Sequence, residues 1–81
     1  MKNNDRLREL LIDFFSLPPE VRLTELSQKA IPSWDSLAMV QLIGELQATF
    51  AVDFDIDEIQ TLRNYEEIRD CLARRGVDVK R

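Results

Sequence analysis

Histidine is absent from this chain of 81 residues, and both cysteine and glycine are scarce. The chain therefore lacks the commonest general base, which excludes catalytic triads and zinc sites that depend on imidazole. Its two glycines, Gly44 and Gly76, stand too far apart to form a phosphate-binding loop. The single cysteine, Cys71, excludes an internal disulfide framework, and we expect it to be a buried structural thiol. This inventory predicts a protein that is not an enzyme.

Basic residues are also fewer than acidic ones, since the chain has 11 lysines and arginines and 15 aspartates and glutamates. The net charge of −4 repels the phosphates of nucleic acids and anionic lipids, so we expect neither class of partner. Residues 1–10 are polar, and Asp13 interrupts the apolar run that follows, so we predict no signal peptide and no membrane insertion. Length and composition predict a single domain, residues 1–81, that is a monomer in the cytoplasm.

Apolar residues recur at helical spacing in the first half of the chain. Residues 7–14 predict a first helix, which Pro18 and Pro19 should end because a residue that precedes proline avoids the helical conformation. A second helix is predicted from Ser36 to Phe50. The connection between them, about residues 16–35, is long for a compact domain and should contain a short helical turn. Four apolar residues should anchor it in the core: Leu23, Leu26, Ile31 and Trp34.

The second half of the chain predicts a short helix and a longer one. Residues 52–56 alternate between apolar and acidic side chains, but no partner strand is apparent, so we predict a loop. Residues 57–62 predict the short helix. Asn64 should cap the last helix, and Gly76 suits a left-handed residue just past its end. The predicted fold is all-α: a small four-helix bundle with three main helices, a short third helix and a long loop between the first and second helices.

An acidic stretch in the second half imitates the opening of a calcium-binding EF-hand loop. Asp53, Asp55 and Asp57 occupy the first, third and fifth positions of such a loop. The sixth position is Glu58, where glycine is needed, and the twelfth is Asn64 instead of glutamate. We therefore predict a solvated acidic loop without a metal ion.

The segment Trp34-Asp35-Ser36-Leu37 marks the start of the second helix. A serine that follows an aspartate at such a place is ordinarily a helix cap. The far side of the helix gives Ser36 a second interpretation. If Ile43, Leu46 and Phe50 face the core, the helical spacing of 100° per residue brings a largely uncharged set of residues to the exposed side. This set leads to Ser36, and we call it the docking strip: Leu37, Val40, Gln41 and Gly44.

Residues 34–43 resemble the Asp-Ser-Leu attachment motif and the apolar second helix of the acyl and peptidyl carrier protein family. Residues 50–54 are similar to the Phe-Gly-Val stretch that this family has after the helix, with Ala51 in place of the glycine. Residues 62–65, followed by Ile68, fit the start of its last helix. The resemblance extends from the first helix to the last, and it combines the motif with a matching length, helix order and acidity.

The resemblance implies a four-helix bundle that a phosphopantetheinyl transferase modifies at Ser36. Coenzyme A would be the source of the covalent 4′-phosphopantetheine arm, whose thiol holds acyl or aminoacyl cargo as a thioester for loading and processing enzymes. Asp35 is implied to orient the motif and to contact the metal of the transferase. A phosphodiester on Ser36 would also lie at the positive end of the helix dipole.

Two features depart from the carriers of fatty-acid synthesis. Trp34 stands where those carriers often have glycine or another small residue, and the exposed side of the second helix is largely neutral where theirs is acidic. The neutral positions are Gln41, Gly44, Gln47 and Ala48. Both features are similar to stand-alone carriers of specialised pathways, such as polyketide, nonribosomal peptide or surface-glycan acylation systems. The alternative is a helical protein-interaction module that is never acylated, in which Ser36 is only a cap.

Overall fold

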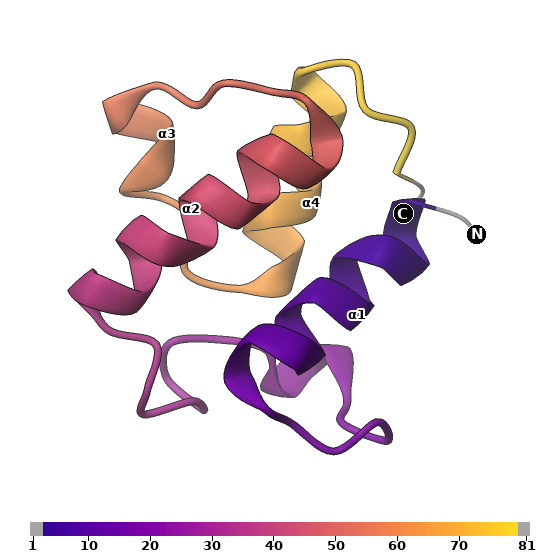
Figure 1. Cartoon of the computed structure of the whole chain (residues 1–81), viewed down its shortest axis with the longest axis vertical. Coiled ribbons are helices and arrows are strands. Elements are labelled where there is room, and N and C mark those ends of the chain that lie inside the picture. The colour runs from indigo at the N-terminus through magenta and orange to yellow at the C-terminus, as the bar shows by residue number, and fades with distance from the viewer. Residues whose placement is uncertain (1–2, 80–81) are drawn as a thin grey trace.

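Helices account for all of the regular structure in residues 3–79, the part of the chain that the computed structural model describes. Three long helices, α1, α2 and α4, surround an apolar core, while the short α3 lies between α2 and α4 in the chain (Figure 1). The bounds are α1 Asn3–Phe15, α2 Ser36–Phe50, α3 Ile56–Ile59 and α4 Tyr65–Arg74, with a 3₁₀ turn, η1, at Leu23–Glu25. This confirms the predicted all-α class with three main helices and a short third one.

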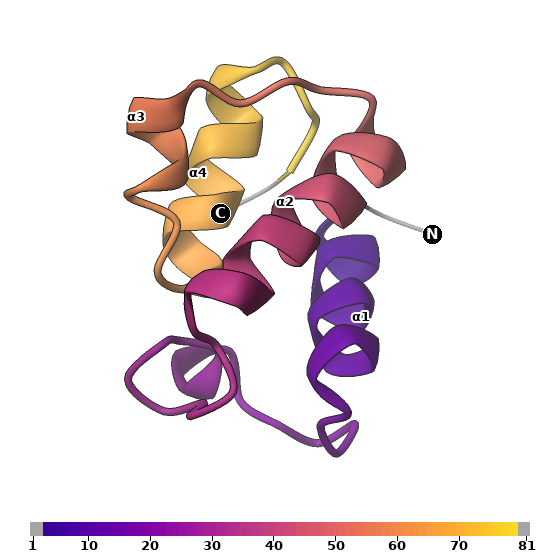
Figure 2. The ribbon, with the colours of Figure 1, turned by 60° about the vertical axis from the view of Figure 1, so that its left-hand side comes forward.

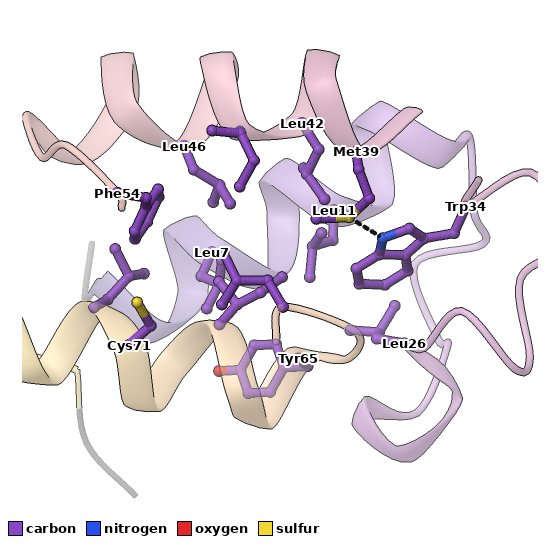
Figure 3. Close-up of a cluster of buried hydrophobic side chains, with 14 of the residues drawn as sticks. Leu7, Leu11, Leu26, Trp34, Met39, Leu42, Leu46, Phe54, Tyr65 and Cys71 are labelled. Atoms are coloured by element: carbon purple, nitrogen blue, oxygen red, sulfur yellow. Dashed lines mark hydrogen bonds between the residues drawn. The ribbon is translucent and has the colours of Figure 1, made fainter. Parts of the chain in front are cut away.

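The core is built from side chains of all three long helices (Figure 3). Burying an aliphatic side chain of this size contributes about 1.5–3 kcal/mol, so these contacts are the main source of stability. The side chains that lose all contact with water are Leu7, Leu11, Leu26, Leu42, Leu46, Leu62, Ile68, Cys71 and Leu72.

The buried face of α2 is rotated slightly from the predicted one. The sequence pattern centred it on Ile43, Leu46 and Phe50, but Leu42 and Leu46 are the fully buried pair and Phe50 is only partly buried. The ring of Phe50 lies under the guanidinium of Arg6, 5.5 Å from the ring centroid, near the end of the helix. This cation–π contact uses a ring face that stays near the surface.

The long connection between α1 and α2 lies beside one end of the helices (Figure 2) and is held by backbone hydrogen bonds. The N–H of Tyr65 donates to the carbonyl of Leu26 at 2.8 Å, and the N–H of Gln28 donates to the carbonyl of Arg63 at 2.9 Å. Leu26, Ile31 and Trp34 are buried as predicted. The prediction for Leu23 was wrong, since it is 41% exposed, because η1 turns its side chain outward.

The predicted range of 57–62 for the short helix was wrong at both ends. α3 spans Ile56–Ile59, and a turn follows it. The hydroxyl of Thr61 donates to the carbonyl of Glu58 at 2.7 Å, and the N–H of Thr61 donates to the same carbonyl at 2.9 Å. A continuing α-helix would give this carbonyl to Leu62, so the threonine competes with the helix and ends it.

Arg75, just past α4, fastens α3 to the end of that helix. Its Nη2 lies 3.2 Å from Oδ2 of Asp55, and it also forms an ion pair with Glu58. The carboxylate of Glu58 accepts a further hydrogen bond of 3.0 Å from the N–H of Asp55. Two acids of the stretch that imitates a calcium loop are therefore engaged in placing α3.

The first and last described segments of the chain meet. The side-chain amide of Asn3 donates to the backbone carbonyl of Asp78 at 3.1 Å, and Val79 is buried in the same core as α1. In addition, Arg6 donates to the carbonyl of Thr49 at 3.1 Å, which ties the start of α1 to the end of α2.

Each long helix ends in a residue with left-handed backbone conformation. These residues are Ser16, Ala51 and Gly76, with φ angles of 54°, 55° and 87°. At the other end of α4, Oδ1 of Asn64 accepts a hydrogen bond of 2.8 Å from the N–H of Glu67, as the predicted cap requires. Glycine takes the left-handed conformation without cost, whereas alanine does not. The replacement of glycine by Ala51 therefore stores strain at the end of α2.

We predict that Ala51→Gly stabilises the protein by about 0.5–1 kcal/mol, because relief of the left-handed strain outweighs the greater freedom of glycine in the unfolded chain. Urea unfolding followed by circular dichroism measures the change. Ala48→Gly is the matched control. Because Ala48 lies inside α2, this variant should lower the free energy of unfolding by about 0.5–1 kcal/mol. Loss of stability in both variants would contradict the strain at Ala51.

Candidate functional site

Ser36 is the first residue of α2, and it is exposed. The preceding residue caps the helix: Asp35 has an extended backbone, and its Oδ1 accepts a hydrogen bond of 2.9 Å from the N–H of Ala38. Within residues 3–79 the Ser36 hydroxyl forms no hydrogen bond of its own. The interpretation of Ser36 as the cap is therefore wrong, and its hydroxyl is left available for reaction.

The residue before this pair is anchored in the core. Trp34 is 3% exposed, and its ring stacks on Phe15 of α1 with centroids 5.0 Å apart. Its indole N–H donates to the sulfur of Met39 at 2.7 Å, across the first turn of α2 (Figure 3). The backbone N–H of Trp34 donates to the carbonyl of Ile31 at 3.0 Å. These contacts leave little freedom to the backbone that carries Asp35 and Ser36.

A hollow of about 350 Å³ opens beside Ser36, between α2 and the segment that leads from α3 to α4. We call it the Ser36 hollow. Besides Ser36, its polar residues are Gln28, Gln60 and Arg63, and its apolar residues are Met39, Val40, Ile43, Ile59 and Leu62. Sequence reasoning missed five of these lining residues: Gln28, Ile59, Gln60, Leu62 and Arg63. The sequence signal for this side of the hollow was the apolar pair Ile59 and Leu62 in the predicted short helix. The position of this pair against α2 is set by tertiary packing, which the sequence pattern does not give.

The docking strip is exposed along its whole length, as its helical spacing predicts. Leu37 and Val40 are 69% and 72% exposed, and Gln41 and Gly44 are also exposed. A Cβ added at Gly44 would meet no atom within 4 Å. Glycine inside a helix costs about 0.5–1 kcal/mol relative to alanine, and no packing within residues 3–79 requires it here. Val40 also lines the Ser36 hollow, so strip and hollow are continuous.

Cys71 is fully buried in α4, as predicted for a structural thiol. Its sulfur donates to Oε2 of Glu58 at 3.2 Å. Burial raises the pKa of the Cys71 thiol, and the positive charge of Arg74 only partly offsets this effect. The thiol therefore stays protonated and unreactive at neutral pH.

A family comparison identifies this region. Residues 34–72, from Trp34 to Leu72, match the model of the phosphopantetheine attachment site. Residues 34–72 are a phosphopantetheine attachment site by sequence. The search of curated proteins and the search of solved structures gave no significant match. None of the helices in residues 3–79 is long and apolar enough to span a bilayer.

Phosphopantetheine attachment domains carry cargo and are not catalysts. Their prosthetic group is 4′-phosphopantetheine, which a phosphopantetheinyl transferase attaches, and loading enzymes supply the cargo. The family match supports the carrier prediction over the alternative of a module that is never acylated.

The start of α2 fits this prosthetic group. Ser36 offers an exposed hydroxyl without a hydrogen bond, and the first turn of a helix favours the negative charge of a phosphodiester. The Ser36 hollow adjoins this hydroxyl and contains a cation, Arg63. When bound, the group supplies a thiol that holds cargo as a thioester.

Because Asp35 is the cap, we predict that Asp35→Ala lowers the free energy of unfolding by about 0.5–2 kcal/mol. Asp35→Asn should retain most of the stability, since asparagine caps helices about as well as aspartate. Urea unfolding of both variants measures the difference. An equal loss in the two would mean that the charge at residue 35, and not the cap, stabilises the helix.

Proposed function

We propose that Ser36 is the attachment residue, and that the domain, residues 1–81, carries thioester cargo on a 4′-phosphopantetheine arm. The observation that supports this most directly is the free, exposed hydroxyl at the first residue of α2. Ser36 is also the one serine in residues 34–72, the range that the family model matches. Other hydroxyls in that range are less suitable, since Thr61 is engaged with Glu58, Tyr65 is buried, and Thr49 lies half-buried in the last turn of α2, away from the start of a helix.

The proposed transfer is a substitution at phosphorus. The Ser36 oxygen forms a bond to the phosphate that bears the pantetheine of coenzyme A, and the pyrophosphate bond breaks. Adenosine 3′,5′-bisphosphate leaves, and the hydroxyl proton passes to a base of the transferase. Asp35 holds the helix start in place through its cap and turns a carboxylate toward solvent, where it can contact the metal of the transferase. Asp35→Asn, which keeps the cap, isolates this second role in a transfer-rate measurement.

The lining of the Ser36 hollow supports an acyl cargo over an aminoacyl cargo. The apolar residues Met39, Val40, Ile43, Ile59 and Leu62 suit an aliphatic chain. The charged residue that lines the hollow is Arg63, which repels an ammonium group, and none of the described lining residues is an acid. The arm can thus place the uncharged part of its cargo against α3 while the thioester waits for an enzyme.

The docking strip is the proposed contact for the transferase and for the loading and processing enzymes. Its exposed apolar side chains, Leu37 and Val40, lie next to Ser36, and Gly44 lets another backbone approach α2 closely. Its neutral character supports a specialised biosynthetic pathway. A reducing compartment such as the cytoplasm keeps the thiol of the arm in its reduced form, ready to form a thioester. The domain acts there as a monomer.

We predict that Ser36→Ala abolishes attachment of the arm. Incubation with a broad-specificity transferase, coenzyme A and magnesium, followed by intact-mass measurement, should show the added mass on the parent chain alone. Because Ser36 is not the cap, the variant should unfold at nearly the same urea concentration as the parent. Ser33→Ala is the matched control and should be modified fully. Attachment to the Ser36→Ala variant at any other hydroxyl would refute the assignment.

We also predict that Gly44→Ala stabilises the free protein by about 0.5–1 kcal/mol, because alanine is the better helix former. The same variant should lower kcat/KM of the transferase about fivefold or more, because an extra methyl overpacks a close contact. Ala51→Gly is the control, since it should also raise stability but lies off the strip. Unchanged kcat/KM in Gly44→Ala, or an equal loss in both variants, would contradict the docking strip.

A further inference from the structure

A second hollow lies on the opposite flank of α2, between that helix and α1. It measures about 550 Å³ and shares no lining residue with the Ser36 hollow. Both ribbon views show α1 beside the C-terminal half of α2, which supplies Glu45 and Thr49 to this hollow (Figures 1 and 2). We call it the α1–α2 groove.

The groove contains an apolar surface formed by one stripe of α1. Leu10 and Phe14 stand one turn apart, and both are only partly buried against the core. The ring of Phe14 is held edge-on against Phe15, with centroids 4.9 Å apart. This pair offers a firm contact for one or two apolar side chains of another molecule.

Three acids surround this apolar pair: Glu9 and Asp13 from α1, and Glu45 from α2. None of them forms an ion pair within residues 3–79, where the ion pairs lie at Arg69 and Arg75. The charge of Asp13 is also unfavourable for α1 itself. It stands near the end of that helix, whose last turn has no basic residue, and the negative end of the dipole repels it.

The arginines of α1 form no ion pair with these acids, because both donate to backbone carbonyls instead. Arg6 also lines the groove, so three carboxylates and one guanidinium give the lining a net charge of −2. Arg6 donates to the carbonyl of Thr49 at 3.1 Å and lies over the ring of Phe50. Arg8 donates to the carbonyls of Pro19 and Val21 at 2.7 Å and 2.8 Å. The groove therefore combines an apolar centre with an excess of negative charge, from three carboxylates that form no ion pair within residues 3–79.

We propose that the α1–α2 groove binds an amphipathic helix of a partner protein, with apolar residues on one face and lysine or arginine along its edges. Leu10 and Phe14 receive the apolar face, and the three carboxylates receive the basic edges. Because the groove and the docking strip lie on different sides of α2, such a partner holds the carrier while Ser36 stays accessible. The inference concerns the unmodified chain and does not depend on the attachment at Ser36.

The test is a titration of the ¹⁵N-labelled, unmodified protein with a synthetic peptide, followed by NMR. The probe has about 14 residues, with leucines on one helical face and lysines along both edges. A peptide with glutamate in place of lysine is the control probe. We expect shift changes in α1 and at residues 45–49, none with the control probe, and weaker binding when NaCl rises from about 50 mM to about 300 mM.

Matched charge variants separate the groove from the general acidity of the chain. The triple variant Glu9→Gln, Asp13→Asn, Glu45→Gln should bind the lysine peptide about tenfold more weakly. The variant Asp53→Asn, Asp57→Asn, Glu66→Gln removes the same charge from exposed acids elsewhere, and its affinity should stay within about twofold of the parent. The NMR spectrum of each variant shows whether it is folded.

Three results would overturn the proposal. Equal weakening in both triple variants would mean that the peptide responds to net charge alone. Shift changes confined to the docking strip would place the peptide on the other side of α2. Concentration-dependent shifts of the groove residues without any peptide, together with dimers in analytical ultracentrifugation, would assign the groove to a second copy of the chain.

Discussion

The geometry at Ser36 depends on the burial of Trp34. Its ring is stacked on Phe15 of α1, and its N–H is bonded to Met39 of α2, so one side chain joins the two helices at the point where the long connection ends. With Trp34 fixed, Asp35 takes the extended conformation that caps α2, and the next residue enters the helix with its hydroxyl free. Where a carrier has a small residue in place of Trp34, other contacts must hold the motif. In this chain the first turn of α2 is coupled directly to the core.

The α2 helix presents four different surfaces around its axis. One face, around Leu42 and Leu46, is fully buried, and the opposite face carries the docking strip. The flank toward α3 borders the Ser36 hollow, and the flank toward α1 borders the α1–α2 groove. α2 thus separates the proposed cargo contact in the Ser36 hollow from the proposed site for a basic helix in the α1–α2 groove. Rotation of this helix would alter all four surfaces together. The buried side chains of Leu42 and Leu46, with the contacts of Trp34 and Arg6 at its two ends, oppose such a rotation.

Local signals were enough to predict the three long helices, but not the bounds of α3 or the lining of the Ser36 hollow. The bounds of α2 and the cap at Asn64 follow from residue types next to each other in the chain, and the structure confirms both. The sequence interpretation that made Ser36 a cap was wrong, because aspartate and serine both cap well and the cap is the residue with extended backbone, which is Asp35. The contribution of Arg63 to the Ser36 hollow also could not be predicted from the sequence, because it depends on how the segment after α3 packs against α2.

The hydrogen bond between Asn3 and Asp78 has a practical consequence for handling the molecule. It brings the two ends of the described chain together, and the Arg6–Thr49 contact places them near the C-terminal end of α2, one helix length from Ser36. A short linker joining the two ends would close the backbone into a ring with little strain, and new ends could then be opened in an exposed turn. Immobilisation on a bead or fluorophore labelling at this corner would likewise keep Ser36, the proposed attachment residue, accessible on the far side.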